Sequence, residues 1–134
     1  MHMTLEADYA VRIVEILAVS NKKIDARCIS EQTHVPLRFA LKILRKLVTD
    51  GIVKSYKGAH GGYMLAKAAD QITLREVIES VEGPYMLSRC QQDEYCCNNT
   101  SCRFHKIYSE ISEIVRNKLE SYTFSQAIKE DGNQ

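Results

Sequence analysis

Residues 36–65 read PLRFALKILRKLVTDGIVKSYKGAHGGYML, and this stretch decides the fold. Its first half repeats apolar residues at three- and four-residue intervals, which predicts a helix with Pro36 as its first residue and Gly51 just past its end. The second half contains two β-prone runs, 52–56 and 62–66, on either side of a glycine-rich turn. This pattern predicts a β-hairpin directly after the helix.

Two capped helices are expected before this stretch. Residues 5–19 place apolar side chains close to a helical period with Thr4 as the N-cap, and Asp25 can cap a shorter helix that ends near residue 32. A tight connection at His34 and Val35 then leads into the next helix. Two short helices followed by a hairpin describe a winged helix-turn-helix, whose second helix lies in the DNA major groove.

Helical patterns also follow the hairpin. Thr73 and Glu76 form a capping box for a helix that ends near Gly83, and residues 104–119 have the apolar repeat of a long amphipathic helix. A second capping box at residues 123–126 opens a terminal helical piece. The expected fold class is therefore mainly α with a small β-hairpin.

The net charge of +1 hides a strong local asymmetry. Between residues 35 and 62 there are six basic residues and one acidic residue, so this segment carries +5 and the remainder −4. The basic residues of the predicted helix lack the acidic partners at four-residue spacing that a merely solvated helix face usually has. A local positive field attracts DNA phosphates even when the whole molecule is nearly neutral.

The helix in this basic segment is expected to have one buried and one DNA-facing side. The expected buried stripe is Leu37, Leu41, Leu44 and Leu47, with Ile43 partly sharing it. The other side and the hairpin tip supply the expected DNA contacts: Arg38, Phe39, Lys42, Arg45, Lys46, Lys57 and His60. The hairpin glycines serve either as turn residues alone or as points where backbone approaches DNA closely.

Four of the five cysteines fall within thirteen residues of the segment CQQDEYCCNNTSCRFH. Cys90, Cys96 and Cys102 are separated by five residues each, and two residues lie between the last of them and His105. Thiolates are soft ligands for iron–sulfur clusters and for zinc. The wide, even spacing predicts a loop around a metal or cluster, with Cys97 outside the ligand set because it breaks the spacing.

Several interpretations of these cysteines stay open. They could hold an iron–sulfur cluster, form a Cys3His zinc site with His105, or act as a thiol switch without metal. An electron-transfer or cluster-carrier protein would use the same loop but would not need a basic hairpin module. Cys28, alone on the second helix, is expected to be a small buried apolar residue.

The chain of 134 residues is long enough for one domain with an appended helix, but not for a second catalytic domain. It has no run of about eighteen apolar residues and no secretory pattern, so we expect a cytoplasmic protein without a membrane partner. In a reducing compartment, clustered cysteines favour metal or redox roles over disulfides. The histidines have no evident serine or aspartate arrangement, so an enzyme is not expected.

Taken in order, these motifs resemble the IscR/NsrR family of iron–sulfur transcription regulators, also called the Rrf2 family, over residues 3–128. The resemblance is carried by TLEADYAVRI, PLRFALKILRKLVTDGIVKS, KGAHGGYML, ITLREVIESVEG and the loop with Cys90, Cys96 and Cys102. It implies a symmetric homodimer in which the long helix packs against its partner. Two winged helices would then meet a palindromic operator in double-stranded DNA.

The resemblance also implies that the three evenly spaced cysteines bind a cluster whose state alters DNA affinity. IscR-like members complete a 2Fe-2S site with a histidine, whose position His105 matches. NsrR-like nitric oxide sensors complete a 4Fe-4S site with an aspartate from the other subunit's first helix, and Asp8 matches that position. Both candidates are present, so the fourth ligand and the cluster type stay open.

Two positions depart from the family pattern. The hairpin offers Lys57 where arginine is common, and Leu41 replaces the acidic base-reading residue of IscR, so no operator sequence is implied. We expect a cluster-dependent transcriptional repressor that senses nitric oxide, redox state or iron supply. Its expected organisation is a winged helix-turn-helix DNA-binding domain at 1–83, a cysteine cluster-binding loop at 84–103, and a dimerisation helix with the C-terminal tail at 104–134.

Overall fold

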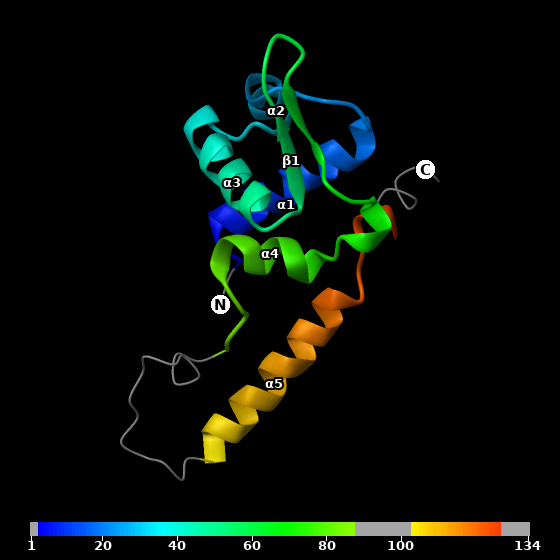
Figure 1. The fold of residues 1–134 in the computed structure, drawn as a ribbon. Coiled ribbons are helices and arrows are strands. Elements are labelled where there is room, and N and C mark those ends of the chain that lie inside the picture. The colour runs from blue at the N-terminus through cyan, green and yellow to red at the C-terminus, as the bar shows by residue number, and fades with distance from the viewer. Residues whose placement is uncertain (1–2, 88–102, 127–134) are drawn as a thin grey trace.

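A computed structural model describes residues 3–87 and 103–126 of the chain. Its elements in chain order are α1 (Leu5–Ser20), α2 (Ala26–Thr33), α3 (Leu37–Thr49), β1 (Val53–Tyr56), β2 (Gly62–Leu65), η1 (Ala69–Gln71), α4 (Leu74–Glu82) and α5 (Arg103–Glu120). The elements from α1 to α4 form one body, and α5 extends away from it (Figure 1). The expected class, mainly α with a small two-stranded hairpin, is confirmed.

Local sequence signals set where the helices begin. Thr4, Asp25 and Thr73 each accept a hydrogen bond from the backbone N–H three residues later, at 3.2, 2.8 and 3.1 Å. Each bond satisfies an N–H that has no partner inside its helix. The three predicted N-caps are confirmed. Pro36 is a correction by one residue, because its ψ of 137° is extended and makes it the N-cap of α3 rather than its first helical residue.

The core lies where α1, α3 and α4 pack together. The part of α3 that enters this core is Ala40, Ile43, Leu44 and Leu47. Leu37 and Leu41 are 37% and 42% exposed, so their predicted burial is wrong. The buried residues and the exposed leucines both recur with a helical period. α1 and α4 pack against the side of α3 that contains Ala40.

The hairpin is attached to the body by a third segment of extended chain. β1 and β2 pair antiparallel with Val53 opposite Leu65. Ile24, between α1 and α2, forms a bridge to Tyr63 through two backbone hydrogen bonds of 3.1 and 2.8 Å. A Cβ on Gly62 would lie 3.0 Å from the Ile24 backbone, so this glycine is needed for close packing inside the protein.

α5 packs with one face only. Ser112 is its one buried residue, and its hydroxyl accepts a hydrogen bond of 2.9 Å from the Leu87 N–H. Arg116 Nε donates to the Tyr85 carbonyl at 2.8 Å, so residues 84–87 lie along the helix. Although α5 has 18 residues, neither it nor any other helix in the described ranges is apolar enough to cross a membrane.

The chain after α5 returns to the body. Phe124 is 5% exposed, and its N–H donates to the Ile72 carbonyl at 3.2 Å. The predicted capping box is confirmed, since the Thr123 N–H donates to Gln126 Oε1 at 3.1 Å and the Gln126 N–H donates to Thr123 Oγ1 at 3.4 Å. The C-terminal end of α5 is therefore anchored beside α4, while its first turn lies far from the body (Figure 1).

Candidate DNA interface and cluster site

The outward side of α3 carries both basic and apolar side chains. Arg38 and Arg45 are exposed, and Leu37 and Leu41 accompany them where the sequence predicted buried residues. Phe39 is half-buried rather than outward-facing: it packs against the core, and its ring centroid lies 6.3 Å from that of Tyr9. A helix that presents both guanidinium and methyl groups can offer hydrogen bonds to guanine and apolar contacts to thymine in a major groove.

Lys42 and Lys46 do not point freely into solvent. Lys42 Nζ lies 2.7 Å from one carboxylate oxygen of Glu6, and Lys46 Nζ lies 3.3 Å from the other. The hydrogen bond from Lys42 lowers the pKa of the Glu6 carboxyl, against the opposing effect of desolvation. Asp50, four residues after Lys46, accepts a hydrogen bond from the Ser80 hydroxyl instead, and the acidic partner of both lysines comes from α1, a distant part of the sequence.

The hairpin tip is an exposed, basic projection. Lys57 and His60 are both exposed there, as the sequence predicted. The turn between the strands needs glycine, because a Cβ on Gly61 would lie 2.4 Å from the Tyr56 carbonyl oxygen. Gly61 and Gly62 are thus needed for close backbone packing within the protein, independently of any contact with DNA.

Sequence reasoning missed one basic residue at the hairpin. Lys23 Nζ lies 4.3 Å from the centroid of the Tyr56 ring, and Lys54 Nζ lies 5.4 Å from the same centroid. An ammonium over an aromatic ring is held by the negative face of that ring. Lys23 precedes the helix-turn-helix, so only the bridge between Ile24 and Tyr63 brings it to the hairpin.

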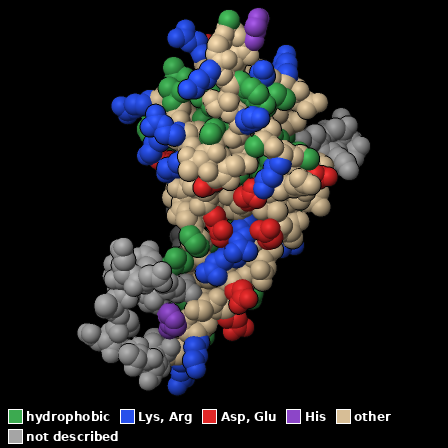
Figure 2. Space-filling model, in the orientation of Figure 1, with side chains coloured by type: hydrophobic (Ala, Val, Ile, Leu, Met, Phe, Trp, Pro, Cys, Tyr) green, Lys and Arg blue, Asp and Glu red, His purple; other side chains and the backbone are tan. Residues whose placement is uncertain are grey.

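Basic side chains gather on one part of the surface. Figure 2 shows Lys and Arg with few Asp or Glu over the region of α3 and the hairpin, whereas basic and acidic side chains are mixed over the region of α4 and α5. The positive segment predicted from residues 35–62 therefore forms a surface in three dimensions. Such a surface suits a polyanion.

The predicted cysteine ligands Cys90, Cys96 and Cys102 lie outside the described residues, and only the candidates for a fourth ligand can be placed. Asp8 is in the first turn of α1, where its Oδ2 lies 2.9 Å from Arg12 Nη2. His105 is exposed in the first turn of α5.

These two candidates lie on different elements, Asp8 on α1 and His105 on α5. The first turn of α5 and the start of α1 are well separated in Figure 1. The donor set nonetheless fits a cluster, since three soft thiolates need one more ligand and either an accessible carboxylate or an imidazole can provide it.

Comparison with known proteins agrees with this geometry. Residues 3–130 match the family model for Rrf2, described as an iron-dependent transcriptional regulator. The chain belongs to the Rrf2 family. It is 28% identical over 131 residues to the HTH-type transcriptional regulator IscR of Xenorhabdus nematophila, and the match covers 96% of this chain and 80% of the relative.

Solved structures of other Rrf2-type regulators show the same fold. IscR of T. potens superposes with a TM-score of 0.78 at 20% identity, covering 98% of this chain and 88% of that one. CymR of B. subtilis, described as the global cysteine regulator, has a TM-score of 0.77 at 22% identity, with coverage of 93% and 94%. The chain is thus a winged-helix transcriptional regulator, and its relatives in this family are regulators rather than enzymes.

Proposed function

We propose that this Rrf2 protein is a homodimeric repressor that binds palindromic DNA with an affinity controlled by an iron–sulfur cluster on Cys90, Cys96 and Cys102. The proposal rests on the evenly spaced cysteines of a chain that belongs to the Rrf2 family, and a set of contacts at the start of α1 suggests how the cysteine segment is coupled to α3. The Thr4 N–H and hydroxyl both donate to the Glu82 carboxylate at the end of α4, shortly before the cysteine segment. Two residues later, Glu6 forms ion pairs with Lys42 and Lys46 of α3.

These contacts give a short path from the cysteine segment to the DNA-reading helix. α4 ends at Glu82, residues 84–87 follow along α5, and Cys90 comes three residues later in the sequence. When bound, a cluster supplies iron–thiolate bonds that nitric oxide or oxidation can break. The chain's own residues then set the separation of the two recognition helices, on which half-site matching depends.

The exposed face of α5 supports the dimer. Phe104, Ile107, Ile111 and Ile114 follow one another at three- and four-residue spacing, and all are exposed. Their side chains therefore form one stripe along the helix, to one side of the face that holds the buried Ser112. A second α5 is the partner that this stripe fits, because a symmetric pair buries the same residues on both chains.

Two fourth ligands remain as alternatives within the proposal. Asp8 of the partner subunit would complete a 4Fe-4S site, and its partly exposed carboxylate near Arg12 is open to a second chain. His105 would complete a 2Fe-2S site from the same chain as the cysteines. If Asp8 is the ligand, Asp8→Ala should change the cluster spectrum. If His105 is the ligand, His105→Ala should change it.

A zinc or thiol switch on the same cysteines is the second candidate function. The fold is shared with CymR, described as a global cysteine regulator. The two candidates differ in metal content: the cluster proposal requires iron and acid-labile sulfide in stoichiometric amounts, whereas the second candidate requires zinc or no metal.

The test is anaerobic purification followed by absorption and Mössbauer spectroscopy, with iron and sulfide analysis, beside an operator-binding assay. Cys96→Ser should lose the cluster and its effect on DNA affinity, while Cys97→Ser, one residue away, should keep both. Asp8→Ala and His105→Ala then assign the fourth ligand by which of them changes the spectrum. Stoichiometric zinc without iron, or DNA binding that is unchanged on cluster removal, would refute the proposal.

A further inference from the structure

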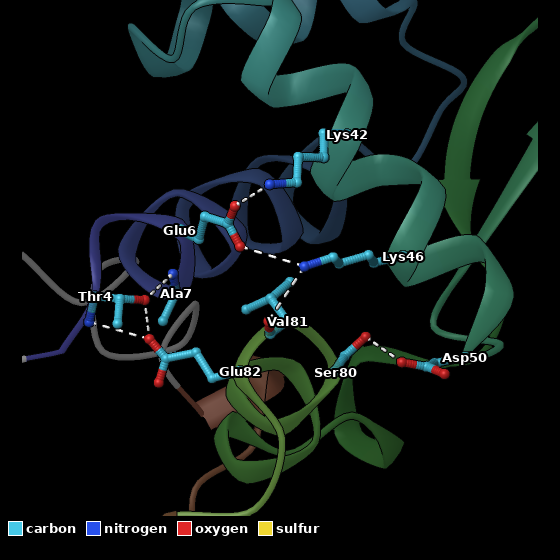
Figure 3. Close-up of polar contacts among 9 residues, drawn as sticks. All are labelled: Thr4, Glu6, Ala7, Lys42, Lys46, Asp50, Ser80, Val81 and Glu82. Atoms are coloured by element: carbon cyan, nitrogen blue, oxygen red, sulfur yellow. Dashed lines mark hydrogen bonds and ion pairs between the residues drawn. The ribbon is translucent and has the colours of Figure 1, made fainter.

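Glu6 lies on α1, and its side chain points toward Lys42 and Lys46 of α3 (Figure 3). Its two carboxylate oxygens contact Lys42 at 2.7 Å and Lys46 at 3.3 Å. Lys46 Nζ also donates to the Val81 carbonyl at 3.4 Å, near the end of α4. The three side chains stay partly accessible, with 28% exposure for Glu6, 57% for Lys42 and 38% for Lys46.

This arrangement divides the basic residues of α3 into two pairs. Lys42 and Lys46 share one carboxylate, whereas within the described part of the chain Arg38 and Arg45 form no ion pair. The four side chains come from one face of one helix, so they would approach one DNA segment together. Only two of them would meet phosphates without first leaving an acidic partner.

We propose that Glu6 is a positioning residue for DNA binding: its carboxylate competes with DNA phosphates for Lys42 and Lys46 and so restrains sequence-independent binding. The inference rests on the proposed function, in which α3 faces DNA. Phosphate attraction supplies essentially all of the affinity for random sequence, so a carboxylate that occupies two lysines acts directly on it. The contacts of Arg38 are not opposed in this way.

The competition predicts a change that loss of packing would not produce. Each lysine released to contact a phosphate makes the slope of log affinity against log salt steeper by about 0.9. Glu6→Gln should therefore bind a random-sequence duplex roughly 3- to 10-fold more tightly at low salt, with a slope steeper by up to about 1.8 per subunit. A purely structural role for Glu6 would lower the melting temperature and leave the slope unchanged.

The experiment measures fluorescence anisotropy of the full-length protein with a labelled random-sequence duplex over a range of salt concentrations. Glu15→Gln is the matched control, because it removes the same charge from an exposed position of α1. Glu6→Gln is then repeated in a background of Lys42→Met with Lys46→Met, where the proposal expects no further effect on affinity or slope. Circular dichroism checks that each variant has the parental helix content.

The outcomes separate this inference from the proposed function. A parental slope in Glu6→Gln, an equal change in Glu15→Gln, or an effect that persists without the two lysines would overturn the competition. If Arg38→Ala weakens binding while Glu6→Gln behaves like the parent, only the role of Glu6 is rejected and α3 still faces DNA. If both variants behave like the parent, the DNA-facing assignment of α3 is rejected as well.

Discussion

The body from α1 to α4 buries many of its large apolar residues, whereas most of those on the helix α5 are exposed. In the body, residues such as Ile13, Ile43 and Leu44 are fully buried. On α5 the only buried residue is Ser112, while Phe104 is 57% exposed. The body therefore buries a hydrophobic core within one chain, and α5 exposes an apolar stripe that the second chain of the proposed dimer would cover. Stability and assembly should respond to different substitutions.

The largest effect is expected in the body. Leu44→Ala should lower the free energy of unfolding by about 2–5 kcal/mol, because it removes a fully buried side chain and leaves a cavity. Leu41→Ala, on the same helix but 42% exposed, should change it by less than about 0.5 kcal/mol. Urea denaturation followed by circular dichroism measures both, and equal losses would contradict the observed phase of α3.

The next effect is expected on assembly. Ile111→Lys places a charge in the middle of the exposed stripe of α5. Burying an isoleucine contributes about 1.5–3 kcal/mol, so the dimer dissociation constant should rise at least about tenfold. Sedimentation measures the dissociation constant, and far-ultraviolet circular dichroism should show an unchanged fold. Glu113→Lys, also exposed on α5, should leave the dimer intact; its dissociation would mean that the partner covers a different face.

This contrast also explains what could be predicted from the sequence. The caps at Thr4, Asp25 and Thr73 were predictable because each acts on an N–H three residues away. The stripe on α5 was predictable because a single helical period runs through it. Signals of this kind depend on neighbours in the sequence and not on the rest of the fold.

The errors concern contacts between distant segments. The burial of Leu37 and Leu41 was wrongly predicted because α3 has two helical rows, and only the packing of the body chooses between them. The pairing of Lys42 and Lys46 with Glu6 spans 36 and 40 residues, so no local spacing rule reveals it. The sequence therefore predicted that the candidate site is a basic surface. It could not predict which lysines of that surface form ion pairs with acidic residues.

A smaller effect should come from the polar contact between α5 and residues 84–87, the segment that follows α4. Ser112→Ala removes the acceptor of the Leu87 N–H and should lower the free energy of unfolding by about 1 kcal/mol. Hydrogen exchange at Leu87 should become faster. Ser121→Ala is the matched control, because its exposed hydroxyl donates only to the nearby Lys118 carbonyl. Unchanged exchange at Leu87 in Ser112→Ala would show that residues 84–87 are held on α5 by other contacts.

The smallest effect on stability is expected at the hairpin tip, which like α5 is exposed but is charged rather than apolar. Lys57→Ala should change the free energy of unfolding by less than about 0.5 kcal/mol, since its side chain is exposed. The salt slope of DNA binding should nevertheless become shallower by about 0.9 per subunit, because one phosphate contact is lost.

Two other lysines make this expectation specific to the hairpin. Lys118→Ala removes the same charge from α5, where the ammonium lies 5.2 Å from the Tyr122 ring centroid, and should leave the slope unchanged. Lys46→Ala should change the salt slope of DNA binding less than Lys57→Ala does, because the Lys46 ammonium already contacts Glu6 and the Val81 carbonyl. If Lys57→Ala and Lys118→Ala gave the same slope as the parent, the hairpin would not reach DNA phosphates. The DNA interface would then be confined to α3, and its unpaired arginines would have to supply most of the electrostatic affinity.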